Sequence, residues 1–245
     1  MNKVLFFDMY QTLVDTEVNP NKEIIENAHI SVFAGFLIKK GIEEVAANVF
    51  QLHFEKLRDD FYLDRDQKIY HHNFKKLVAQ TFDKFYSINA EDKVLGELIW
   101  QYRILVRGKT QLYDGVKKTL EKLSEEYNIY LASYTQASYS ILELEELGIK
   151  QYFKGFIFSS DIGYKKVSDN FYKNCIEISG IDASNCVMIG DHPFEDMYMA
   201  NKNGMKTIWI KNPASKHRTD DRVVVPDCEV AIEDFYKLPE IIKNI

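Results

Sequence analysis

The sequence predicts an α/β fold, with a parallel sheet that carries helices on both faces and an all-helical insert near its start. Short apolar runs alternate with helical patterns over the second half of the chain. A similar apolar run opens the chain, and between the two, from Thr16 to Lys109, we find helical periodicity and no convincing strand. Alternating strands and helices form parallel sheets, because each connection must cross one face of the sheet.

The composition is typical of a well-packed protein and argues against two classes of partner, nucleic acids and membranes. The chain has 245 residues, of which 46% are hydrophobic and 28% are charged, enough for a core domain with a smaller insert. The net charge is −6 without a basic run, so we expect no nucleic-acid partner. Without a membrane-length apolar stretch or a signal-peptide pattern, we expect no membrane partner. Three cysteines without metal-binding spacing are typical of reduced thiols in a cytoplasmic protein: Cys175, Cys186 and Cys228.

The first element is the apolar run from Lys3 to Phe7, which is followed directly by Asp8. A short continuous apolar run is typical of a strand that is buried on both faces. Ligands of open α/β sheets bind just beyond the carboxyl ends of the strands. We therefore expect Asp8 at the edge of the sheet where a ligand would bind.

The helical insert follows this first strand. Apolar residues recur every three or four positions in four stretches, which predict helices near residues 21–40, 43–61, 67–86 and 90–106. Their aromatic residues are assigned to the core of the insert and not to ligand contacts. The sequence thus predicts a helical domain at 16–109 and an α/β domain made of 1–15 and 110–245.

The α/β domain continues with four further apolar runs. They predict strands at residues 128–133, 156–159, 186–191 and 206–210. Helical patterns separate them, and three of these patterns end at a glycine, which is a common helix stop. The predicted helices are residues 116–127, 137–147, 169–179 and 195–203, with a short strand near 229–230 and a last helix from about 232.

Polar residues follow several of these strands, and in a parallel sheet they would meet at one edge. Two or three carboxylates with a hydroxyl and an ammonium group suit Mg²⁺-assisted attack on a phosphoryl group. A carboxylate is the nucleophile, hard oxygen ligands hold Mg²⁺, and the hydroxyl and ammonium groups bind phosphoryl oxygens. The residues concerned are Asp8, Ser133, Lys165 or Lys166, Asp191 and Asp196.

These motifs, in their order and spacing, resemble the haloacid dehalogenase-like (HAD) hydrolase superfamily. The matches are Asp8-x-x-x-Thr12 after the first strand, Ser133 after the second, a loop lysine, and Gly190-Asp191-x-x-x-x-Asp196. They cover both parts of the α/β domain, and the insert is similar to the helical cap that this family places there. The resemblance implies a Rossmann-like core under a cap that opens and closes.

The resemblance also implies a role for each matched residue. Asp8 would be the nucleophile, and Thr12 and Ser133 would contact the phosphoryl group. Lys166 would bind that group and Asp8, and it is preferred to Lys165 because it lies three residues after Gly163. Mg²⁺ would be held by Asp8, Asp191 and the main-chain carbonyl of Tyr10, and Asp196 would support the metal site or orient Lys166.

Tyr10 departs from the phosphatase pattern, which has a second aspartate there as general acid and base. A tyrosine, with an ordinary pKa of about 10, replaces it poorly, and losing such a group typically costs about 10²–10⁴ in rate. The 2-haloacid dehalogenases carry tyrosine at this position and use no metal, but they usually replace Asp191 and hold the substrate with an early arginine. Here the first arginine is Arg58, deep in a helix. Other departures are Gln11 for glycine, Tyr134 for asparagine and Val167 for proline.

Three functions remain open at this point. The leading hypothesis is a Mg²⁺-dependent hydrolase of a small phosphate monoester. The second is a 2-haloacid dehalogenase with a small halogenated substrate, and the third is a protein that binds a phosphorylated ligand without turnover. The sequence leaves the substrate and the oligomeric state open, because specificity depends on the cap surface. Side chains that could reach the site are Tyr62, Arg65, His71, His72, Arg103 and His192.

Overall fold

A six-stranded parallel sheet forms the centre of the α/β part of the molecule. The computed structural model describes residues 3–42, 47–215 and 226–245. The strands stand in the order β5-β4-β1-β6-β7-β8, and every neighbouring pair is parallel. They are β1 (Val4–Phe7), β4 (Asn128–Ser133), β5 (Gly155–Phe158), β6 (Cys186–Gly190), β7 (Lys206–Lys211) and β8 (Cys228–Ala231). The predicted parallel sheet is confirmed.

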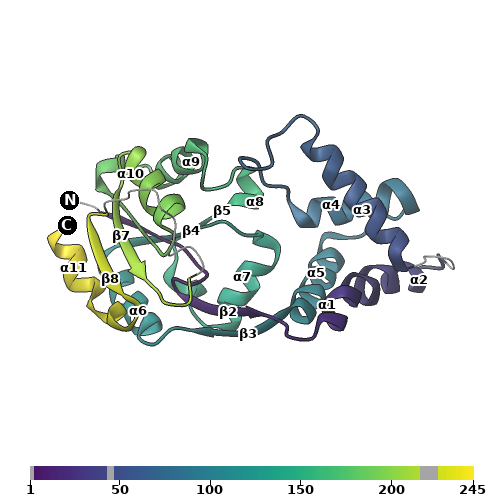
Figure 1. Ribbon diagram of the computed structural model, residues 1–245, viewed down its shortest axis with the longest axis horizontal. Coiled ribbons are helices and arrows are strands. Elements are labelled where there is room, and N and C mark those ends of the chain that lie inside the picture. Colours follow the sequence, from purple (N-terminus) through teal and green to yellow (C-terminus); the bar gives the residue numbers. More distant parts are fainter. Residues whose placement is uncertain (1–2, 43–46, 216–225) are drawn as a thin grey trace.

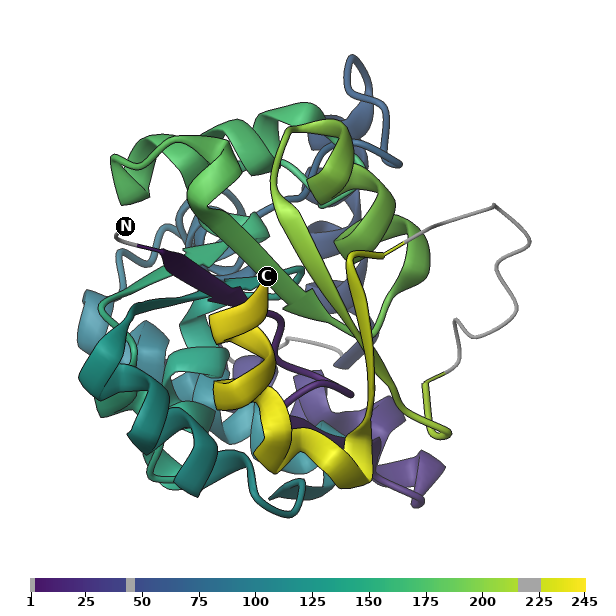
Figure 2. The same cartoon turned by 90° about the vertical axis from the view of Figure 1, so that its left-hand side faces the viewer.

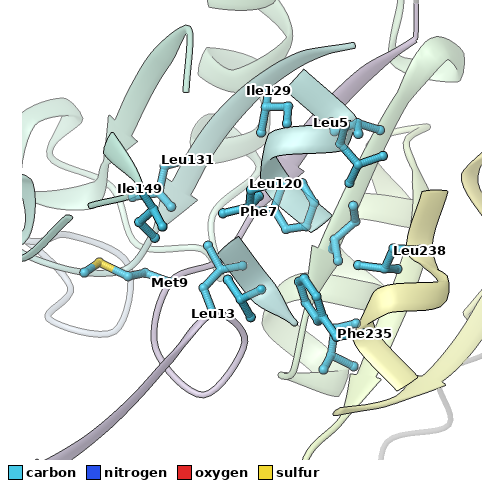
Figure 3. Close-up of a cluster of buried hydrophobic side chains, with 14 of the residues drawn as sticks. Leu5, Phe7, Met9, Leu13, Leu120, Ile129, Leu131, Ile149, Phe235 and Leu238 are labelled. Carbon is cyan, nitrogen blue, oxygen red and sulfur yellow. The ribbon is translucent and has the colours of Figure 1, made fainter. Parts of the chain in front are cut away.

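Helices cover both faces of the sheet, and each face has its own buried cluster. Leu5 and Phe7 of β1 belong to one cluster (Figure 3), and Val4 and Phe6 belong to the other. Both faces of β1 are therefore apolar, which explains the uninterrupted apolar run in the sequence. The helices are α6 (Val116–Glu126), α7 (Ala137–Glu146), α8 (Ser159–Ile162), α9 (Asp169–Ser179), α10 (Met199–Lys202) and α11 (Leu238–Asn244).

The helices of the insert lie at the far end of the molecule from both chain termini (Figure 1). They form a third buried cluster, in which the ring of Phe33 packs against Phe50 and Tyr102 at centroid distances of 5.3 and 5.4 Å. The aromatic residues of the insert thus pack against each other. The helices are α1 (Lys22–His29), α2 (Gly35–Lys39), α3 (Ala47–Tyr62), α4 (Phe74–Tyr86) and α5 (Asp92–Val106), with a π-helical turn η1 (Ile30–Ala34) between α1 and α2.

Two strands join these helices to the sheet domain, where the sequence predicted none. β2 (Val14–Val18) and β3 (Arg107–Leu112) pair in antiparallel fashion as a separate ribbon (Figure 1). Their residues are mostly polar and partly exposed. A ribbon that is half-exposed along its length needs no apolar run, so the pattern that predicts buried strands could not find it.

Several helix boundaries also differ from the prediction. The third helix begins at Phe74, because the side chain of Asn73 accepts a hydrogen bond from the Lys76 amide (3.1 Å) and caps it. The polar residues before it form a loop that bridges to the sheet domain, Tyr70 to Tyr164. The helix predicted at 195–203 begins instead with a π-helical turn, η4 (Pro193–Tyr198). The predicted start of the second helix, at Glu43, lies outside the described residues.

The two ends of the described chain lie together at the sheet end of the molecule (Figure 2). Lys3 Nζ donates hydrogen bonds to the carbonyls of Ile242 and Ile245 at 2.7 and 2.9 Å. The three cysteines are free thiols. None of the helices in the described ranges is both long and apolar enough to cross a membrane.

Candidate active site

Three neighbouring strands bring three of the predicted residues to one point. Asp8 follows β1, Ser133 is the last residue of β4, and Asp191 follows β6. The chain runs from β1 outward through β4 and β5 and then returns to the other side of β1 at β6. Ligands of open α/β sheets bind at such a reversal. Ser133 Oγ donates a hydrogen bond of 3.1 Å to Asp8 Oδ1.

Lys166 lies buried between two carboxylates. Its Nζ donates to Asp8 Oδ1 at 2.5 Å and to Asp196 Oδ1 at 2.6 Å, and the residue is 2% exposed. Burial lowers the pKa of Lys166, but the charges of Asp196 and Asp8 outweigh this effect and hold the pKa above its ordinary value. Lys165 instead places its ammonium over the ring of Tyr134. The structure therefore puts Lys166, and not Lys165, beside Asp8.

The carboxylates at this point fit a divalent cation. Oxygen atoms of Asp8, Asp191 and Asp196 lie within 4.8 Å of one another, and all three residues are buried. Lys166 supplies one positive charge to three carboxylates. Burial and the charges of Asp8 and Asp196 accordingly raise the pKa of Asp191 to about 7. Hard oxygen donors with excess negative charge are the set that Mg²⁺ prefers.

Local contacts fix two of these carboxylates. Asp196 Oδ2 accepts a hydrogen bond from the His192 amide (3.0 Å). The Asp196 side chain packs on Gly190, where an added Cβ would lie only 2.7 Å from Asp196 Cβ, so this position requires glycine. Thr12 Oγ1 donates to Asp191 Oδ1 (3.3 Å), and Trp209 Nε1 donates to the Asp191 carbonyl (2.9 Å). The predicted motif around Asp191 thus forms one rigid turn.

Tyr10 lines the cavity that contains Asp8, but its hydroxyl is bound outside that cavity. The hydroxyl donates to the carboxylate of Glu143 on α7 and lies 3.2 Å from Ser140 Oγ. Glu143 is fully buried, and Arg103 Nε of α5 donates to its Oε1 at 2.8 Å. Burial, together with the charge of Glu143, holds the pKa of Tyr10 above its ordinary value. The role of the Tyr10 carbonyl as a metal ligand stays a prediction.

Glu143 is a residue that the sequence analysis missed. It comes from a helix that carries several glutamates, and nothing in its spacing sets it apart from the exposed Glu145 and Glu146. Arg107 also approaches it, with Nη1 3.5 Å from Glu143 Oε1. Its partners come from the end of α5 and the start of β3, far away in the sequence, so no local pattern points to it.

Gln11 occupies a backbone conformation that favours glycine. Its φ is 61°, in the left-handed region that costs other residues about 1–2 kcal/mol. Two contacts hold it there: Tyr113 donates to Gln11 Oε1 (2.8 Å), and Asn212 Nδ2 donates to the Gln11 carbonyl (2.7 Å). The turn after Asp8 therefore keeps its shape without the glycine that similar proteins prefer.

The candidate residues enclose a small cavity of about 150 Å³. His192 reaches its wall and also caps the next turn, because its Nδ1 accepts from the Glu195 amide (3.3 Å). The five candidate residues of the insert do not line this cavity. Arg65 pairs with Asp64 on the surface. The residues that line the cavity are Asp8, Tyr10, Gln11, Ser133, Tyr134, Lys166, Asp191, His192, Glu195 and Asp196.

Two other candidates from the insert, His71 and His72, contact the sheet domain. His71 Nδ1 lies 2.7 Å from Ser159 Oγ, and Gln136 Nε2 donates to the carbonyl of His72 (2.8 Å). His72 Nδ1 also lies 2.9 Å from the hydroxyl of Tyr62. Their contacts are therefore structural in this conformation.

Comparison with known proteins assigns this site to a family. A family model for haloacid dehalogenase-like hydrolases matches residues 2–204. The chain belongs to the haloacid dehalogenase-like hydrolases. This HAD-like hydrolase is 24% identical over 214 residues to the glyceraldehyde 3-phosphate phosphatase of Pyrococcus abyssi, covering 86% of this chain and 82% of the relative. It is 23% identical over 213 residues to the pyrimidine 5'-nucleotidase PynA of Streptococcus pneumoniae, covering 86% and 84%.

Solved structures share the fold of this HAD-like hydrolase. A 2-haloacid dehalogenase from Pseudomonas syringae superposes with a TM-score of 0.63 at 24% identity, covering 100% of this chain and 99% of that one. The HAD-hydrolase YfnB from Bacillus subtilis, bound to magnesium, superposes with a TM-score of 0.55 at 20% identity, covering 100% and 99%. The predicted family, its hydrolase class and the α/β fold are confirmed.

Proposed function

We propose that this protein is a Mg²⁺-dependent phosphatase that acts on small phosphate monoesters with Asp8 as the nucleophile. One observation carries the proposal: Lys166 joins Asp8 to Asp196, and oxygens of Asp191 lie within 4.8 Å of both carboxylates. This arrangement has a nucleophile, a cation for the phosphoryl group and a metal-binding set at one sheet edge. Curated relatives that are named phosphatases and a nucleotidase support the same reaction class.

The hydrogen bonds that Asp8 accepts indicate which of its two oxygens attacks phosphorus. Ser133 and Lys166 both donate to Oδ1 of Asp8, so we assign Oδ2 as the attacking oxygen. Asp8 Oδ2 forms a bond to phosphorus, the ester oxygen leaves with the alcohol and takes a proton from water, and an aspartyl-phosphate remains. Water then attacks phosphorus, the bond to Asp8 breaks, and phosphate departs. Asp8 and Asp191 would hold Mg²⁺, which would supply charge neutralisation for the phosphoryl oxygens when bound.

Tyr10 limits which esters react fast. Its hydroxyl donates a hydrogen bond to Glu143, and its raised pKa makes it a weak acid. The leaving alcohol therefore receives little help from a protein acid. We expect the highest rates for esters whose alcohol is a good leaving group without protonation.

A carbon–halogen hydrolase is the second candidate, and Tyr10 is the observation that favours it. In that reaction Asp8 would displace halide from a 2-halo acid, and water would hydrolyse the resulting ester. The buried metal-binding carboxylate Asp191 would have no part in it. Binding of a phosphorylated ligand without turnover is the third candidate, because Tyr10 replaces the usual general acid and base.

One paired assay separates the three candidates. The purified protein and an Asp8→Asn variant are given an aryl phosphate or a 2-chloro acid, each with Mg²⁺ and with EDTA. Phosphate release that needs Mg²⁺ and is lost in the variant supports the phosphatase. Chloride release that survives EDTA supports the dehalogenase. No release in either assay, with phosphate-ester binding retained, supports the binding protein.

A further inference from the structure

Lys165 lies beside the site but has no role in the reaction proposed above. Its Nζ lies 5.1 Å from the ring centroid of Tyr134. Tyr134 follows Ser133 directly, lines the cavity that contains Asp8, and is 40% exposed. The ammonium of Lys165 therefore lies on the ring of Tyr134, a residue of the cavity wall.

The insert holds this pair of side chains in place. The amide of Lys165 donates to the carbonyl of Ile69 (2.8 Å), and the amide of His71 donates to the carbonyl of Gly163 (2.9 Å). The ring of His71 also contacts the ring of Tyr134, edge to face, at a centroid distance of 4.8 Å. Tyr134 thus lies against His71 and Lys165, and both the backbone of Lys165 and the ring beneath its ammonium are fixed.

The ammonium of Lys165 lies outside the ion pairs that hold Lys166. Within the described ranges it forms no ion pair, whereas Lys166 contacts two carboxylates. Burial lowers the pKa of His71 to about 3, and the charge of Lys165 adds to this lowering. The same charge acts on Glu195, another residue of the cavity wall. The ammonium is therefore within electrostatic reach of Glu195 on the cavity wall and of His71 on the insert.

We propose that Lys165, held over Tyr134, is an anion subsite that selects phosphate monoesters bearing a second negative charge on the alcohol part. The second charge is a carboxylate or another phosphate, because a lysine ammonium binds either as a point charge. The phosphoryl group occupies the Lys166 side of the cavity, and the second anion occupies the Tyr134 side. This inference rests on the proposed phosphatase function and names the substrate class of the same site.

Binding measurements test the subsite without requiring turnover. Calorimetry with Mg²⁺ on the Asp8→Asn protein compares three probes: ethyl phosphate, phosphoglycolate and ethane bisphosphate. The last two add a carboxylate or a phosphate to a short ester. Adding Lys165→Met should weaken binding of a doubly charged probe about tenfold, which is the loss of one charge-assisted contact, and should leave ethyl phosphate unchanged. The probe that responds identifies the anion.

Two further variants are controls for the effect of Lys165→Met on binding. Lys165→Arg keeps the charge and should retain most of the preference. Lys84→Met removes a matched lysine, which lies over the ring of Phe85 at 5.8 Å on the insert, and should change none of the affinities. Equal effects of Lys165→Met on all three probes, or no effect, would overturn the subsite. If no probe binds to any variant, the proposed phosphatase function fails and the subsite fails with it.

Discussion

The hydroxyl of Tyr10 donates a hydrogen bond to the fully buried carboxylate of Glu143. Tyr10 stands at the position of the usual second aspartate. Its hydroxyl is therefore bound to a residue of helix α7 and does not face the substrate. Arg103 and Arg107, from the end of α5 and the start of β3, approach the same carboxylate. One buried glutamate thus links the strand end that carries Asp8, a helix of the sheet domain and the insert.

Glu143→Ala should lower the free energy of unfolding by about 3 kcal/mol, because it leaves the charge of Arg103, whose side chain is only 17% exposed, without its partner. Urea denaturation measures the change. Glu146→Ala is the matched control: Glu146 pairs with Arg107 at 2.6 Å but its side chain is 52% exposed, so its loss should cost less than about 1 kcal/mol. Equal losses for the two variants would contradict the importance of the buried pair.

Asp191→Asn should stabilise the protein without Mg²⁺ by about 1–2 kcal/mol, because it removes one of three crowded carboxylate charges. Mg²⁺ should raise the Tm of the wild type and have little effect on the variant. Thermal unfolding with Mg²⁺ or EDTA gives both results. Asp64→Asn removes the same charge from a side chain that is 75% exposed and should keep the wild-type response. A full Mg²⁺ shift in Asp191→Asn would exclude this residue as a ligand.

The contribution of His71 and His72 to the stability of the protein should be lost as the pH drops below 6.5. Burial lowers the pKa of His71 to about 3 and that of His72 to about 4 in the folded protein, while the unfolded chain binds protons near 6.5. The unfolded state thus gains protons first, so the stabilisation is complete above pH 6.5 and is lost below it. Urea denaturation at about pH 7 and about pH 5 should show that His71→Gln loses about 1–2 kcal/mol less than the wild type.

Lys166→Met should abolish phosphate release and also lower the free energy of unfolding by about 3 kcal/mol, because Asp8 and Asp196 remain buried without their cation. Steady-state assay and denaturation on one preparation measure both effects. Lys165→Met removes a charge that forms no ion pair in the described part of the chain, so this variant should unfold like the wild type. If the two variants lose equal stability, the assignment of Lys166 to the buried position is wrong.

The fold and the meeting point of the candidate residues follow from the pattern of apolar and polar residues along the chain. Strands buried on both faces must be apolar throughout, as Val4–Phe7 shows, so they are visible without a structure. The ends of parallel strands lie at one edge whatever the side chains are. The convergence of Asp8, Ser133 and Asp191 follows from that geometry alone.

Elements without such a constraint were not visible in the sequence. The ribbon of Val14–Val18 and Arg107–Leu112 is polar because it is partly exposed, and its two strands are stabilised mainly by pairing with each other. The loop before Phe74 carries the contacts of His71 to the sheet domain. The path of this loop depends on partners far along the chain. The apolar periodicity of the sequence therefore predicted a helix that runs through the loop.

The environment of each charged side chain depends on contacts between residues that are far apart in the sequence. Spacing favoured Lys166 over Lys165, but the contact with Asp8, 158 residues away, identifies the buried lysine. Glu143 is buried because Tyr10 and Arg103, 133 and 40 residues away, meet it. A charge is stable in the interior only where a partner of opposite charge or a hydrogen-bond donor reaches it, and the folded chain alone brings such distant partners together.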